Sequence, residues 1–125
     1  MRLVKCLLIL LFSCLIISCS LIKTSYNNAP ALSIWWLDDY FNFNSAQNLV
    51  LKPALQKLHA WHRKTQLPQM IVLMQDIQTS LANNKISATE ACEKIDKVKL
   101  TVQTLQIESI PISIEMAPLL SDKQL

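Results

Sequence analysis

The chain has 125 residues, enough for one small domain, and contains 12 basic residues, nine acidic residues and no glycine. The lack of glycine excludes glycine-rich phosphate loops, dinucleotide-binding turns and nucleophile elbows, because each of these motifs needs glycine at fixed positions. It also argues against an all-β fold, since tight hairpins use glycine where φ is positive. The basic residues form no cluster of the kind that binds nucleic acid, so we expect no nucleic-acid partner.

Residues 1–18 have the charge order of a secretory signal peptide. Arg2 and Lys5 precede an apolar run that ends at Ile17, and no acidic residue appears before Asp38. The run is shorter than the roughly 20 residues that a membrane-spanning helix needs. Without this segment, 10 basic residues face nine acidic ones, so most of the net positive charge belongs to the signal. We therefore expect residues 1–18 to be removed.

The segment Leu15-Ile16-Ile17-Ser18-Cys19 resembles the bacterial lipobox. This resemblance implies that the thiol of Cys19 receives a diacylglyceryl group and that Cys19 becomes the lipidated N-terminus. Several acyl chains, of the palmitate type, would hold the protein durably on a lipid bilayer. The expected location is the periplasmic face of the cell envelope, and the outer membrane is favoured because Ser20 follows the cysteine instead of aspartate. An ordinary secretory signal and an uncleaved N-terminal anchor are the alternatives.

Residues 19–29 are predicted to form a short tether between the lipid and the folded domain. They show no helical apolar stripe, and roughly ten extended residues reach at most about 35 Å. The folded domain is then expected to span residues 30–125 and to lie close to the membrane surface.

Helical patterns begin at once in this domain. Residues 30–40 predict a short helix with Pro30 in its first turn. Asn44 or Ser45 offers the N-cap of a second helix, in which apolar residues recur every three or four positions until about Lys64. Pro53 lies inside that pattern and predicts either a kink or a later start.

Two further helices are predicted after Pro68. The apolar spacing from Met70 to Leu81 indicates one helix, which we expect to stop at Asn83-Asn84. The clearest start in the chain follows, because Ser87 and Glu90 have the spacing of a capping box. Apolar residues at intervals of three and four continue behind it to Leu105.

The last residues of the chain combine patterns of a strand and of a helix. Residues 110–116 alternate between apolar and polar side chains, as a strand does, although Pro111 would also suit the first turn of a short helix. We favour the helix, since a single strand would have no partner. Ser121 and Gln124 repeat the capping-box spacing with no helix behind them, which suggests a domain that is incomplete at its C-terminus. The whole pattern predicts an all-α protein, a small antiparallel helical bundle.

Several short motifs resemble an uncharacterised family of proteobacterial lipoproteins, described only as a domain of unknown function. The motifs are Tyr26-Asn27-Asn28, Trp36-Leu37-Asp38-Asp39-Tyr40, Gln47, Trp61-His62-Arg63 and Leu67-Pro68. The resemblance covers roughly residues 15–68 and becomes vague afterwards. Members of that family are typically about twice as long, so this chain resembles a C-terminally truncated member. The resemblance implies a helical fold and an envelope location, and no activity.

A second resemblance concerns two pentapeptides, Phe43–Gln47 and Leu120–Gln124. They are similar to the paired Leu-Thr-x-x-Gln motifs of the small periplasmic stress chaperones. That resemblance implies a helical cradle for unfolded proteins, which an exposed apolar surface with basic edges would favour.

The candidate interaction surface consists of aromatic and charged residues of the motifs above: Trp36, Asp38, Asp39, Tyr40, Trp61, His62 and Arg63. Adjacent carboxylates on a helix point about 100° apart, so the two aspartates alone cannot form a catalytic dyad. They suit a cation, a basic partner or simple solvation of the helix. The aromatic residues suit either the membrane interface or the core of the domain.

The sequence gives little support for a metal site or a reactive cysteine. His59 and His62 lie one helical turn apart, but a zinc site needs three or four ligands, so we predict no metal and no cofactor. Cys92 lies on the apolar stripe of the helix that begins at Ser87, and it is predicted to be buried as a small apolar residue. A hydrolase using Asp38 or Asp39 with His62 is the least favoured alternative.

These features together predict a membrane-anchored periplasmic lipoprotein that is not an enzyme. Its partners would be the lipid bilayer, through acylated Cys19, and an unidentified envelope protein that it binds or supports. The alternative is a periplasmic chaperone-like or envelope-stress protein that binds unfolded clients.

Overall fold

The computed structural model describes residues 21–83 and 86–125, so the predicted signal peptide, Cys19 and Asn84 lie outside the described residues. Within these two ranges the regular elements are all helical, which confirms the all-α fold. None of the helices in the described ranges is long and apolar enough to cross a membrane. The chain divides into two compact units, the first ending at Phe41 and the second beginning at Asn42.

The first unit contains helical residues 21–27 followed by helix α2 (Ala29–Phe41). Helix α2 confirms the helix predicted for residues 30–40. The tether, in contrast, is helical over 21–27 where the sequence suggested extended chain, and a helix rises only about 1.5 Å per residue. Beyond α2 the backbone of Asn42 has a φ of 49°. Asparagine is the residue that most readily replaces glycine in this left-handed conformation at the end of a helix.

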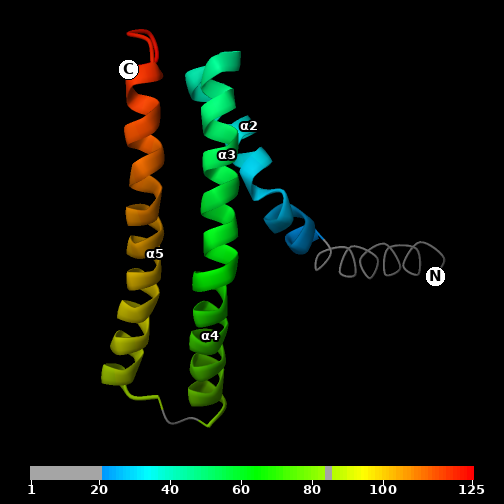
Figure 1. Ribbon diagram of the computed structural model, residues 1–125. Coiled ribbons are helices and arrows are strands. Elements are labelled where there is room, and N and C mark those ends of the chain that lie inside the picture. The colour runs from blue at the N-terminus through cyan, green and yellow to red at the C-terminus, as the bar shows by residue number, and fades with distance from the viewer. Residues whose placement is uncertain (1–20, 84–85) are drawn as a thin grey trace, which may run out of the picture. The chain divides into compact units, whose positions relative to one another are not determined.

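The second unit begins with one long helical rod (Figure 1). It consists of helix α3 (Ser45–Trp61), a π-helical turn (His62–Gln66) and helix α4 (Leu67–Ala82). Asn44 caps α3, and its side chain and that of Gln47 each accept a hydrogen bond from the other residue's backbone N–H, both at 2.9 Å. The predicted start of the second helix is therefore confirmed. The α-helix itself ends at Trp61, close to the predicted end at about Lys64, but the π-helical turn carries the chain directly into α4.

Neither proline breaks the rod. Pro53 lies inside α3, and the helix continues through it. Pro68 lies in the first turn of α4, where the missing N–H is least costly. The wider π-helical turn stands immediately before Pro68 and gives the backbone another way to meet its hydrogen bonds.

Helix α5 (Ala88–Met116) returns antiparallel alongside α3 and α4 (Figure 1). Ser87 and Glu90 form the predicted capping box at its start. The helix includes Pro111 and continues through residues 110–116, so these residues are helical, as favoured, but belong to α5 and not to a separate short helix. A short 3-10 turn (Ala117–Leu119) follows, and Ser121 opens only a turn.

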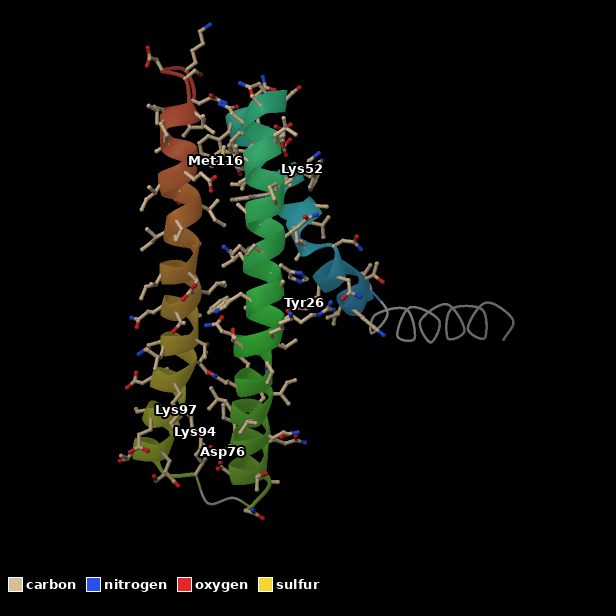
Figure 2. The ribbon with its side chains drawn as sticks, viewed as in Figure 1. Tyr26, Lys52, Asp76, Lys94, Lys97 and Met116 are labelled. Carbon is tan, nitrogen blue, oxygen red and sulfur yellow. The ribbon has the colours of Figure 1, made fainter. Side chains whose placement is uncertain are left out.

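The second unit is thus a helical hairpin with a thin core. Among the described residues, Leu51 of α3 and Met116 of α5 are the buried apolar side chains, and Gln47 and Gln66 are the buried polar ones. Figure 2 shows Met116 at the end of α5 that lies beside the start of α3. Two antiparallel rods can bury only the stripe on which they touch, so many large apolar side chains remain exposed. Few residues of the apolar stripes predicted from the sequence are therefore buried.

Candidate functional site

The structure places the predicted interaction residues in both units. Trp36, Asp38, Asp39 and Tyr40 belong to α2 of the first unit. The rings of Trp36 and Tyr40, four residues apart on one face of α2, lie 5.0 Å apart at a tilt of 59°. Both rings are largely exposed, as is Trp35. Trp35, Trp36 and Tyr40 therefore lie on the surface of their own unit, whereas Phe41 at the end of α2 is half-buried.

Trp61, His62 and Arg63 lie in the second unit, where α3 passes into the π-helical turn. The turn is fastened to α5 by Gln66, whose buried amide donates a hydrogen bond of 2.9 Å to the backbone carbonyl of Thr101. Partial burial, with a smaller contribution from the charge of His59, lowers the pKa of His62. The neutral imidazole is therefore favoured in the folded protein.

A polar connection at the open end of the hairpin joins two segments that are far apart in the sequence. The buried amide of Gln47 donates hydrogen bonds to the carbonyl oxygen of Leu119, at 2.7 Å, and to the Oε1 atom of Gln124, at 3.0 Å. Gln124 donates in return to Oε1 of Gln47 at 3.1 Å. The backbone N–H and hydroxyl of Ser121 also donate to Oε1 of Gln124. The pentapeptides ending at Gln47 and Gln124, which the sequence analysis paired by similarity, thus meet in the structure.

The structure also contains an apolar groove of about 550 Å³ at the other end of the hairpin, which the sequence did not predict. It is lined chiefly by residues of α5, with Ile77 of α4 and Ile86 before the helix. The groove residues of α5 are Ala91, Lys94, Ile95, Val98, Lys99, Val102 and Gln103. The sequence pattern did mark Ile77, Ile95 and Val102 as apolar stripes, but it indicated a core. They line a groove because the described part of the hairpin provides no third helix to cover them.

The charges around this groove are paired. Lys94 forms a salt bridge with Asp76 across α4 and α5, and Figure 2 shows these two side chains between the helices. The hydrogen bond from Lys94, aided by its positive charge, lowers the pKa of Asp76. Lys99 pairs with Asp96 one turn away at 2.9 Å. The apolar groove therefore has basic edges that are largely neutralised, which suits an uncharged, apolar ligand surface better than an acidic one.

Two further positions bear on chemistry. Cys92 is exposed, so the prediction that it is buried was wrong. Cys92 follows Ala91, and one residue along a helix corresponds to a rotation of about 100°. The side chain of Cys92 therefore points away from the contact with α4. Among residues 21–83 and 86–125, no group of three or more His, Cys, Asp or Glu side chains is arranged to hold a metal ion.

Comparison with known proteins identifies the family but no activity. No curated protein and no solved structure shows a significant match to the chain. A family model described as "Family of unknown function (DUF6279)" matches residues 39–125. The match includes the whole helical hairpin but only the second part of residues 15–68, where the sequence motifs had suggested the strongest resemblance. Tyr26-Asn27-Asn28 and Trp36-Leu37-Asp38 precede the matched residues. The chain is therefore a member of the DUF6279 family of unknown function.

Proposed function

We propose that this protein is a lipid-anchored lipoprotein of the bacterial envelope that binds another envelope protein without catalysing a reaction. The lipobox-like segment ending at Cys19 supports the anchor, and the groove between α4 and α5 supports the binding role. The proposed occupant of the groove is an apolar helix or extended segment of the partner.

The groove is the observation that carries this proposal. Ile95 and Val102 lie on its wall and remain about half exposed, at 53% and 52%. Covering apolar surface contributes roughly 25 cal/mol for each Å² removed from water, so an apolar segment would gain free energy by lying here. Lys94 and Lys99 already have aspartate partners, so an acidic segment would have to compete with these ion pairs.

A chaperone-like role is the second candidate, and a specific observation favours it. The groove is open and apolar, and the paired pentapeptides that resemble the stress-chaperone motifs meet through Gln47 and Gln124. A chaperone-like groove would accept many unrelated unfolded segments, whereas a dedicated binding module would accept one.

Site-specific photocross-linking in living cells tests the proposal. A photoreactive residue replacing Ile95, in the groove, is compared with one replacing Val72, which is exposed on α4 but does not line the groove. We expect Ile95 to capture one defined envelope protein reproducibly, and Val102→Glu to abolish that capture while Val72→Glu leaves it intact.

The other outcomes separate the candidates. Capture of many unrelated proteins at position 95, all lost with Val102→Glu, would favour the chaperone-like role. Equal capture at positions 95 and 72, or capture that Val102→Glu leaves unchanged, would contradict a binding function for the groove.

A further inference from the structure

We infer that α5 carries a second apolar seam through which two copies of this chain associate. The seam is centred on a different face of α5 from the groove, so the inference does not depend on a partner in the groove. The effective concentration at a membrane rests on the proposed lipid anchor. The members of the seam are Leu100, Ile107, Ile110 and Ile114.

The spacing of these residues is that of a coiled-coil seam. Leu100, Ile107 and Ile114 are seven residues apart, and Ile110 stands three residues after Ile107 and four before Ile114. The half-buried residues Val98, Leu105 and Ile112 share the same repeat two positions earlier. Two residues correspond to about 200° around a helix, so the seam faces away from the side of α5 that packs inside the hairpin.

The seam is exposed along its length. Leu100 is 60% exposed, Ile107 63%, Ile110 50% and Ile114 67%. Four large aliphatic side chains at this spacing form an apolar stripe, interrupted by Gln103 between Leu100 and Ile107. Such a stripe is unusual for a surface that contacts only water.

The charges beside the seam favour a second copy as the occupant. A face that meets its own copy brings identical side chains together, so charged flanks would repel one another. Between Leu100 and Ile114 the positions directly beside the seam are uncharged: Thr104, Gln106, Pro111 and Ser113. Glu108 lies further around the helix, where it lines a pocket together with Lys57 of α3. Lys99 stands at the start of the seam and is paired with Asp96 of the same helix. The flanks therefore offer no charge barrier to self-association and no charge that would select a different partner.

The area that the seam can bury is at the lower edge of what such a contact needs. Covering these four side chains on each of two copies removes roughly 800–1,000 Å² from water, near the lower limit of about 1,000 Å² for a specific interface. An anchor that confines both copies to one surface would raise their effective concentration. A reversible dimer is therefore expected.

Light scattering from the full chain in mild detergent tests this inference. We expect the protein mass to rise towards twice the protomer mass with concentration. Ile107→Glu should keep the protein monomeric at every concentration, and the matched variant Val72→Glu should behave like the unaltered chain. A monomeric unaltered chain, or a dimer that persists in Ile107→Glu with its helicity intact, would overturn the inference.

If Ile107→Glu loses helicity, cysteine cross-linking in membranes provides a second test of the dimer. In a Cys92→Ser background, Ile107→Cys should form a cross-linked dimer on mild oxidation, well above the background given by Val72→Cys. Self-cross-linking of Leu100→Cys and Ile114→Cys would support a parallel dimer, and cross-linking between those two variants when co-expressed would support an antiparallel one. No excess for Ile107→Cys over Val72→Cys would refute the dimer.

Discussion

At the scale of single residues, two buried glutamines connect the helices of the hairpin, a role that apolar residues usually have. Gln47 is only 2% exposed, yet its amide meets three partners: the N-cap of α3, the turn after α5 and Gln124. Buried polar groups are costly unless they are hydrogen-bonded, and this one fixes which parts of the chain lie side by side. The thin core of the hairpin makes such a directional contact more important.

Replacing Gln47 should therefore destabilise the hairpin. Gln47→Leu leaves the carbonyl of Leu119 and the amide of Gln124 without this partner, so we expect the free energy of unfolding to fall by about 1–3 kcal/mol. Urea unfolding of the chain in detergent, followed by far-UV circular dichroism, measures the change. Gln56→Leu, at an exposed position of the same helix, is the control and should have little effect. A Gln47→Leu variant as stable as the unaltered chain would show that the connection is unimportant.

His62 makes stability depend on pH. Its pKa is lowered in the folded protein relative to an ordinary histidine of about 6.5, because partial burial and His59 disfavour the charged form. The unfolded chain therefore binds the proton more readily. The stabilising contribution is fully present above the ordinary pKa and is lost as the pH falls through about 6.5 towards the lowered value.

We thus expect the melting temperature to fall between pH 7 and pH 5, and His62→Gln to weaken that dependence. Thermal unfolding at a series of pH values, with His59→Gln as the comparison, measures it. His59→Gln should weaken the dependence less, since the charge of His59 is the smaller cause of the lowered pKa. Identical pH profiles for the unaltered chain and His62→Gln would contradict this explanation.

At the scale of helices, local signals predicted starts well and ends poorly. The capping residues Asn44 and Ser87 are visible in the sequence, because side chains that accept hydrogen bonds at the first turn have a characteristic spacing. The positions of Pro53, Pro68 and Pro111 suggested breaks that the structure does not contain. Proline removes one hydrogen bond from a helix, but packing along a long partner helix can outweigh that loss.

The candidate sites also depend on how the helices pack against one another. Periodicity marked the apolar residues of α4 and α5, but it does not specify whether another helix covers them. The groove around Ile95 and the seam around Ile107 can be identified only once the geometry of the hairpin is known. Cys92 was misplaced for a related reason, since the apolar stripe is wider than the surface that actually touches α4.

At the scale of the whole molecule, a hairpin of two rods leaves more apolar surface open than a closed bundle does. We interpret this openness as the basis of function: the groove between α4 and α5 for a partner and the outer seam of α5 for a second copy. The lipid anchor proposed at Cys19 would bring both surfaces to a membrane. Membership of a family of unknown function is compatible with this role and does not assign it.

The most direct test of this account is metabolic labelling of the full chain with a radioactive or clickable palmitate in bacterial cells. We expect the protein to incorporate the label and to fractionate with membranes. Cys19→Ala should abolish the label, whereas Cys14→Ala should incorporate it normally. Incorporation that persists in Cys19→Ala, or an unlabelled protein free of membranes, would contradict the lipid anchor and with it the proposed place of action.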